Sequence, residues 1–313
     1  MDVIIVCHTE FGFVSGRDII FDKNATEGVS SGVLNLIKIA DKYGAKVSFA
    51  VCPETVPYFP RNINHEIGLH IHPGWQKFSC KNFKFTVGDK YLKENCKQSV
   101  NSTILRDFNF EEQLEMIKKG KEYLVSEFKK QPKIFVAGRW SLNSDTIKAL
   151  VKEGFTHDLS APSHSISDHY DWIKLPRICM PYNPSEKDYQ KEGDLPILMV
   201  PISQTLFGGT VSPEGVITYG LPWLLSCFEE YYKTKAPLFH ICLHSPSMTD
   251  DYYCEIFDKL LSFILTHKNI NFKFASEIKK YPKQKLTGSI WPYFFGVNKE
   301  FLKTALNRIL RVF

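Results

Sequence analysis

Short apolar segments alternate with amphipathic segments along most of this chain, and this alternation restricts the folds that it can adopt. Val3–Val6 is rich in β-branched residues and predicts a buried strand. Further strands are predicted at 45–51, 65–72, 133–138, 197–203, 238–244 and 270–276, with amphipathic helices between several of them. Strands that alternate with helices form a parallel sheet with right-handed crossovers. About seven or eight such units predict an α/β fold with a closed or nearly closed barrel.

Unusual polar side chains lie at the ends of four predicted strands, where the active sites of parallel α/β barrels form. They are His8 and Glu10, His70 and His72, Arg139, and His244. Within each pair the residues are two positions apart, so both side chains point to the same face of the strand. We therefore expect all of these side chains to converge on the mouth of the barrel.

Glu10, His70 and His72 form a set of one carboxylate and two imidazoles, which suits Zn²⁺ and other borderline divalent ions. Three protein ligands leave a position for a water, whose pKa falls toward about 7 on a bound metal. Histidine pairs on strands also occur as packed side chains, so the spacing alone leaves both interpretations open. Polar groups at the ends of several strands favour the metal site.

Composition excludes some classes of function. The net charge is +5, from 39 basic and 34 acidic residues, and no aromatic-basic motif accompanies it, so we expect no nucleic-acid partner. The first residues predict a strand rather than a signal peptide, and no run of about 18 apolar residues is present to span a membrane. The cysteines are scattered, and Cys7, Cys52, Cys227 and Cys242 have apolar neighbours typical of buried thiols. We therefore expect a cytoplasmic protein without disulfides.

Five stretches, taken in order, resemble the polysaccharide deacetylase family, carbohydrate esterase family 4, and most of all its WbmS-like branch from surface-polysaccharide biosynthesis clusters. They are "CHTE" (7–10), "HEIGLHIHPGW" (65–75), "FVAGRWSLNSDTIKALVKEGFTHDLS" (135–160), "LPILMVPIS" (195–203) and "LHSPSM" (243–248). The resemblance implies a distorted (β/α) barrel with roughly seven strands in a single domain. It also implies a divalent metal and hydrolysis of an N-acetyl, N-formyl or O-acetyl group on a sugar.

The resemblance implies metal ligands residue by residue. Glu10 matches the metal-binding acid of the family's first motif, and His70 matches the first histidine of its second motif. The second histidine of that motif usually lies four residues further along the chain. Gly74 occupies that place here, and His72 is the nearest substitute.

The same resemblance implies catalytic residues. His8 stands where the family usually has a carboxylate base, and an imidazole with an ordinary pKa near 6.5 can also serve as a base. Arg139 resembles the arginine that orients the base, and His244 resembles the histidine that protonates the leaving amine. Trp172 is a looser match to an aromatic residue that packs against that histidine. The reverse assignment, with His8 as ligand and Glu10 as base, stays open, although the family position favours Glu10 as the ligand.

We therefore predict a deacetylase, dependent on Zn²⁺ or another divalent transition metal, that acts on an N-acetylated or N-formylated sugar of a surface-polysaccharide or lipid-linked glycan precursor. Two alternatives are a catalytically impaired, sugar-binding pseudoenzyme and a metal-dependent amidohydrolase that acts on a non-sugar amide. We expect one barrel domain at 1–285, with insertions near 77–107 and 160–195.

The last residues, 286–313, predict a basic amphipathic tail. Apolar residues there include Leu302, Leu306 and Leu310, and they alternate with Lys303 and Arg311. Such a helix can lie on an anionic membrane surface, or it can dock on the barrel. The first arrangement would place the protein at the inner face of a membrane.

Overall fold

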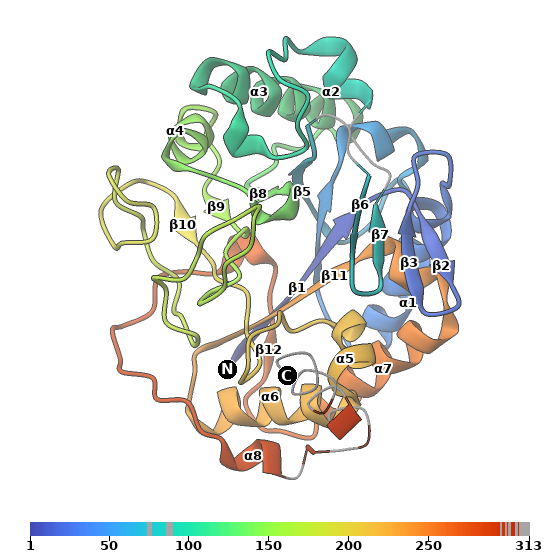
Figure 1. Cartoon of the computed structure of the whole chain (residues 1–313), viewed down its shortest axis with the longest axis vertical. Helices are drawn as coiled ribbons and strands as arrows, with labels where there is room; N and C mark the ends of the chain where they lie inside the picture. The colour runs from blue at the N-terminus through green and yellow to red at the C-terminus, as the bar shows by residue number, and fades with distance from the viewer. Residues whose placement is uncertain are drawn as a thin grey trace.

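The centre of the molecule is a curled sheet of parallel strands in the order β10–β9–β8–β5–β4–β1–β11, with β12 paired to the start of β1 (Figure 1). The structure is a computed structural model that describes residues 1–73, 77–85, 90–294, 296–297, 299, 302–303 and 306. In chain order, the strands are β1 (Asp2–Thr9), β4 (Val47–Val51), β5 (Glu66–Ile71), β8 (Ile134–Ala137), β9 (His157–Asp158), β10 (Leu198–Met199), β11 (Leu238–His244) and β12 (Asn271–Phe272). The predicted α/β fold with a parallel sheet is confirmed.

One irregular segment joins the two ends of this sheet, which are β10 and β11. The segment is 200–203, which follows β10. The Ser203 backbone N–H donates to the His240 carbonyl (3.3 Å), and the His240 N–H donates to Ser203 Oγ (2.9 Å). A regular barrel would have a continuous series of backbone hydrogen bonds between two strands here. The barrel is therefore distorted, as the resemblance implies.

Successive residues of β1 point alternately to the inside and the outside of the barrel, as expected for a strand. Val3 and Ile5 pack with apolar side chains of the surrounding helices, whereas Ile4 and Val6 belong to a smaller inner core. The inner core consists of Ile4, Val6, Ala50, Ile134, Val136, Leu159, Leu198, Val200, Leu238, Ala275 and Ile278. On β1 this inner core ends at Val6, because the next inward residue is the polar His8.

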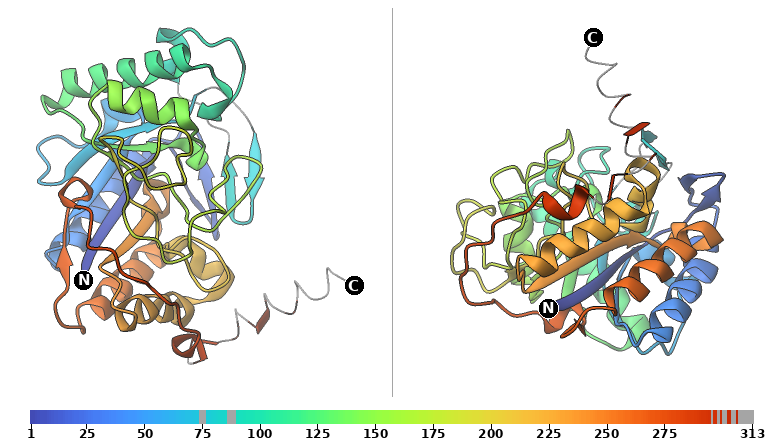
Figure 2. Two further views of the ribbon diagram at one scale, coloured as in Figure 1. Left: turned by 90° about the vertical axis from the view of Figure 1, so that its left-hand side faces the viewer. Right: turned by 90° about the horizontal axis from the view of Figure 1, so that it is seen from below.

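Helices lie around the outside of the sheet, where the strand-to-strand crossovers place them (Figure 2). They are α1 (Val33–Lys42), α2 (Lys90–Asn95), α3 (Phe110–Phe128), α4 (Ser144–Lys152), α5 (Val216–Tyr219), α6 (Leu221–Lys233), α7 (Asp251–Ile264) and α8 (Trp291–Phe294). Among the described residues, no helix is long and apolar enough to cross a membrane. None of the eight cysteines forms a disulfide, and Cys7, Cys52, Cys227 and Cys242 are buried, as predicted.

A second, smaller sheet has the order β2–β3–β7–β6. Its strands are β2 (Phe13–Ser15), β3 (Asp18–Phe21), β6 (Phe78–Cys80) and β7 (Phe83–Phe85). The first two come from the loop after β1, and the last two come from the predicted insertion at 77–107. That insertion is therefore more than a surface loop, because its hairpin pairs with β3 through β7. The insertion at 160–195 is irregular and held by isolated bridges such as Ile166–Asp171.

Candidate active site

The strand ends bring the predicted side chains together at one cavity of about 270 Å³. His8 is on β1 and Glu10 follows that strand directly, His70 is on β5 and His72 follows it, Arg139 lies in the turn after β8, and His244 ends β11. The His8 ring lies 4.7 Å from the His70 ring and 4.8 Å from the His244 ring, between centroids. All of them line the cavity except His70, whose ring contacts Glu10.

The Glu10 carboxylate is the centre of the predicted metal site. Its Oε1 lies 2.9 Å from His70 Nε2 and 2.7 Å from His72 Nε2. Within the part of the chain that the structure describes, its second oxygen, Oε2, is buried without a hydrogen-bond partner. Burial raises the pKa of Glu10, but the two imidazoles outweigh it and hold that pKa well below its usual range. The side chain is therefore a buried carboxylate anion that faces two ring nitrogens.

The orientation of His70 indicates what belongs between these groups. Its Nδ1 lies 2.9 Å from the Val136 carbonyl, which can only accept, so Nδ1 carries the hydrogen. In the neutral ring, Nε2 then has a lone pair that faces the Glu10 carboxylate. Two acceptors at this distance repel each other unless a proton or a metal cation lies between them. A backbone carbonyl that orients a metal-binding imidazole in this way is common in metal sites, so the residues fit a divalent ion.

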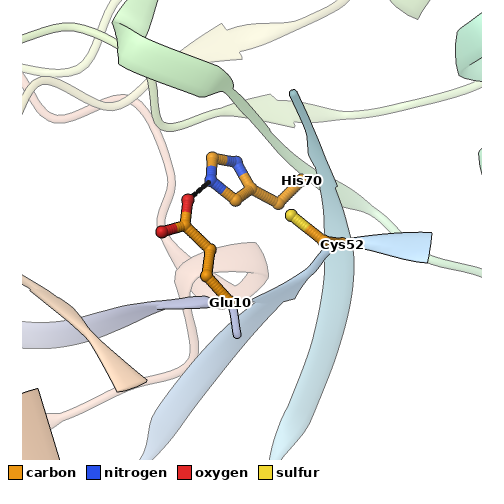
Figure 3. Close-up of side chains that lie close together, drawn as sticks. All are labelled: Glu10, Cys52 and His70. Carbon is orange, nitrogen blue, oxygen red and sulfur yellow. Dashed lines mark hydrogen bonds and ion pairs between the residues drawn. The ribbon is translucent and has the colours of Figure 1, made fainter. Parts of the chain in front are cut away.

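A third donor, Cys52, lies beside Glu10 and His70 (Figure 3). The ligand atoms of Glu10, Cys52 and His70 all lie within 4.8 Å of one another, and all three side chains are buried. Sequence analysis predicted only that Cys52 is a buried thiol. It gave no role to this residue because it follows a different strand, β4, and no motif connects it to the other two.

His72 is close to the predicted site but is not part of this three-donor group. Its Nε2 contacts Glu10, its Nδ1 has no partner among the described residues, and burial lowers its pKa to about 4. A Cβ on Gly138 would lie 2.5 Å from His72 Nδ1, so only glycine leaves room for this ring. The ligand role of His72 stays a prediction, and Gly74 lies outside the described residues.

His8 lies between the predicted metal ligands and His244. Its Nε2 is 3.4 Å from Cys242 Sγ. Burial, together with the neighbouring His70 and His244, holds the pKa of His8 well below its usual value, so the ring is neutral near pH 7. A neutral imidazole can accept a proton. Because Glu10 and not His8 contacts both imidazoles of the second motif, the arrangement favours Glu10 as the ligand and His8 as the base.

His244 is held by a carboxylate that sequence analysis missed. Glu214 Oε1 accepts the His244 backbone N–H (2.7 Å), and its Oε2 lies 3.0 Å from His244 Nδ1. Burial lowers the pKa of His244, but the charge and hydrogen bond of Glu214 outweigh burial and raise it. Ser212 Oγ donates to the same carboxylate (2.8 Å). The pair keeps His244 charged to higher pH, which suits a proton donor.

Arg139 and Trp140 occupy a strained turn at the cavity wall. Both have a φ of 53°, in the left-handed region, which costs of the order of 1–3 kcal/mol for each residue. The Arg139 guanidinium lies 5.5 Å from the centre of the Phe85 ring. Trp172 donates its Nε1–H to the Trp140 carbonyl (3.1 Å) and thereby supports this turn. The looser prediction that Trp172 packs against His244 is therefore wrong; Phe21 and Phe83 pack there instead.

A buried hydroxyl fixes the backbone of Glu10. Ser245 Oγ accepts the Glu10 N–H (3.1 Å) and donates to the Glu10 carbonyl (3.2 Å). The helical turn before α1 packs against this contact through two glycines. A Cβ added to Gly28 would lie 2.7 Å from the Glu10 carbonyl oxygen. A Cβ added to Gly32 would lie 2.2 Å from the Ser245 carbonyl oxygen. The glycines therefore permit the close approach that holds Glu10 in place.

Aromatic side chains form much of the cavity wall. Phe83 and Phe85 come from β7, and Trp140 and Tyr170 line the same cavity. His169, from the insertion at 160–195, also lines the cavity. Flat aromatic faces beside polar groups suit a ligand that has both apolar faces and polar edges, as a sugar ring does.

Comparisons with known proteins find the fold but no close relative. No protein-family model matches the chain, and no curated protein does. A provisionally named polysaccharide deacetylase from Mycobacterium smegmatis is 16% identical, with a TM-score of 0.52, over 90% of this chain and 95% of that chain. Another from Pseudomonas aeruginosa PAO1 is 13% identical (TM-score 0.53), as is PuuE allantoinase (TM-score 0.55), and both matches cover 88% of each chain. The chain therefore has the fold of polysaccharide deacetylases, which an allantoinase shares.

Proposed function

We propose that this protein is a metal-dependent hydrolase that removes an acetyl or formyl group from the amino group of a sugar. The observation that carries the proposal is the buried Glu10 carboxylate, whose one oxygen is contacted by two imidazole nitrogens, beside a cavity lined by His8 and His244. The fold and the order of the sequence motifs support the same family. The narrower likeness to the WbmS-like branch stays a prediction.

Glu10 and His70 would hold the ion, with His72 as the third predicted ligand. A bound divalent ion supplies polarisation of the acyl carbonyl and a lower pKa for a water in the site. The Glu10 carboxylate offsets part of the ionic charge in a buried place where an unpaired charge would be costly. The Val136 carbonyl keeps His70 in the tautomer that presents Nε2.

The remaining residues would move protons. Amide hydrolysis requires the attacking water to lose a proton and the departing nitrogen to gain one as the C–N bond breaks. His8 is neutral and would accept the first proton. His244, kept protonated by Glu214, would donate the second. Arg139 would stabilise negative charge near Glu10 and the acyl oxygen, because its guanidinium lines the same cavity.

We further propose an N-acylated sugar of a surface-polysaccharide or lipid-linked precursor as the substrate. The aromatic wall formed by Phe83, Phe85 and Trp140 supports a sugar over a small acyclic amide, because sugar rings stack on aromatic faces. A non-sugar amide and a non-catalytic sugar-binding role are the alternatives. Release of acetate or formate from N-acyl sugars, compared with ring opening of cyclic amides, separates all three, because a sugar-binding protein without activity would do neither.

The test combines metal content with acyl release. We expect the dialysed wild-type protein to retain a divalent ion and to release acetate or formate from simple N-acyl sugars. We expect His70→Ala to bind the ion at least about 100-fold more weakly, because changing even a residue that only orients a ligand lowers metal affinity by about 10–100-fold. We also expect this variant to lose acyl release. His267→Ala is the matched control, because His267 pairs with Glu229 away from the cavity and should change neither. Full activity of His70→Ala or of a metal-free wild type would overturn the proposal.

The tail supports a separate proposal about membranes. Within 286–313, Ile290, Trp291 and Phe294 are exposed, while most of the following residues lie outside the described ones. We propose that this segment contacts anionic membranes, as the alternation of apolar and basic residues predicts. The full chain should co-sediment with phosphatidylserine vesicles, and a chain that ends at residue 285 should do so much less. Equal sedimentation of both would discard the idea.

A further inference from the structure

We propose that Cys52 is a thiolate ligand of the same metal centre, so that oxygen, sulfur and nitrogen donors from three neighbouring strands hold the ion. This inference rests on the proposed function for the existence of the centre, and it adds the nature of its ligands. It does not remove His72 from the predicted set. The proposal is carried by strand register, by the fixed backbone of Cys52 and by the charge of the site.

The register of the sheet places the three donors in one row. Thr9 of β1 pairs with Val51 of β4, and Val51 pairs with Leu69 of β5. The next residue on each chain is therefore Glu10, Cys52 and His70, at the same level of three adjacent parallel strands. Residues at one level on one face of a sheet are near neighbours, so the row is fixed by strand pairing rather than by loop conformation.

The backbone of Cys52 is fixed on both sides. Its N–H donates to the Thr9 carbonyl (3.3 Å), and its carbonyl accepts from the Thr55 N–H (2.9 Å) and Thr55 Oγ1 (2.7 Å). Thr55 is itself fully buried. Only rotation about the Cα–Cβ bond remains to bring Sγ onto an ion. Ligand atoms around one tetrahedral Zn²⁺ are about 3.5 Å apart, so the 4.8 Å limit on the present separations leaves about 1 Å of closure.

Charge favours the thiolate as well. Glu10 is 4% exposed, Cys52 3% and His70 0%. A carboxylate and a thiolate together neutralise a divalent ion, whereas one carboxylate with two imidazoles leaves a net positive charge in a buried site. Buried charge is costly unless it is balanced. Sulfur also selects Zn²⁺ or Co²⁺ over Mg²⁺, Ca²⁺ and Mn²⁺, which prefer oxygen ligands.

With Cys52 as a ligand, the metal position can still be reached from the cavity. Glu10 and His72 line the cavity, whereas Cys52 is not among its lining residues. Catalytic zinc sites keep one position for water, with three protein ligands. His72 is outside the three-donor group and lines the cavity. It is therefore the ligand that could give up its coordination position to a water or a substrate. Cys52 would then be a permanent ligand and His72 an exchangeable one.

Cobalt substitution tests the proposal by absorption rather than by activity. The Co²⁺-loaded wild type should show a thiolate-to-metal charge-transfer band in the near ultraviolet. Cys52→Ser should lose that band and bind Zn²⁺ at least about 10-fold more weakly, because a sulfur atom that binds the ion directly is lost. Cys227→Ser is the matched control for a buried thiol elsewhere, and Cys242→Ser controls for the thiol beside His8. Both controls should keep the band, and a Cys52→Ser spectrum identical to wild type would overturn the proposal.

X-ray absorption at the zinc edge tests the wild type directly, even if Cys52→Ser does not fold. One sulfur at about 2.3 Å beside nitrogen and oxygen ligands supports Cys52, and a shell of nitrogen and oxygen alone overturns it. The outcomes separate the two proposals. A sulfur-ligated protein that releases no acyl group contradicts the proposed function only. An active enzyme without a sulfur ligand contradicts the Cys52 proposal only, and a protein that binds no ion contradicts both.

Discussion

Replacing Glu10 with glutamine is expected to abolish tight metal binding and to lower kcat/KM by at least about 10²–10³-fold, as loss of a preorganised electrostatic group does. The amide keeps the size of the side chain but loses the negative charge that faces His70 and His72. Its NH₂ group can donate to the imidazole that now carries the unshared lone pair, so the protein should stay folded. Metal content after dialysis, acyl release and circular dichroism measure the three expectations.

Glu66→Gln is the control for this variant. Glu66 begins β5, four residues before His70, and its Oε2 accepts from Ser48 Oγ (2.6 Å) at the opposite end of the strand from the cavity. The same carboxylate-to-amide change there should leave both metal content and kcat/KM close to wild type. A Glu10→Gln protein that keeps its ion and its activity would show that this carboxylate is not a ligand.

Replacing Glu214 with glutamine is expected to lower kcat by about 10²–10⁴-fold, the range that a general acid or base contributes. Glu214 raises the pKa of His244, so removing its charge lowers that pKa. A general acid works in its protonated form, and activity falls as the pH rises through its pKa. The basic limb of the pH–kcat profile should therefore move to lower pH in the variant. KM should change much less, because Glu214 acts through His244 and does not line the cavity.

A second carboxylate–histidine pair provides the control for this experiment. Glu229 Oε1 lies 2.8 Å from His267 Nε2, and neither residue lines the cavity. Glu229→Gln should leave both kcat and the position of the basic limb unchanged. An unshifted profile in Glu214→Gln would mean that His244 does not donate the proton.

The barrel and the predicted side chains could be derived from sequence because both follow from local rules. Alternation of apolar strands and helices predicts the parallel sheet. The two-residue spacing of His8 and Glu10 predicts that both side chains lie on one face of the strand, and both line the cavity. The convergence at the carboxyl ends of the strands then follows from the parallel arrangement alone.

Other features depend on contacts that local patterns do not encode. The role of Cys52 depends on the register of β4 against β1 and β5, and a shift by one residue would turn its side chain outward. Glu214 lies in a short turn 30 residues before His244, and no spacing or periodicity connects the two. Phe83 and Phe85 reach the cavity because a polar insertion forms a hairpin that pairs with β3. Such pairings between distant segments emerge only when the chain is folded.

The hydroxyl of Ser245 couples the positions of two residues of the site, His244 and Glu10. Ser245 directly follows His244, and it holds the backbone of Glu10, 235 residues earlier in the chain, through both its hydrogen bonds. A displacement of the turn after β11 therefore moves His244 and the Glu10 carboxylate together. The separation between these two residues is therefore set by the pairing of β1 with β11 in the barrel, rather than by the loops over the cavity.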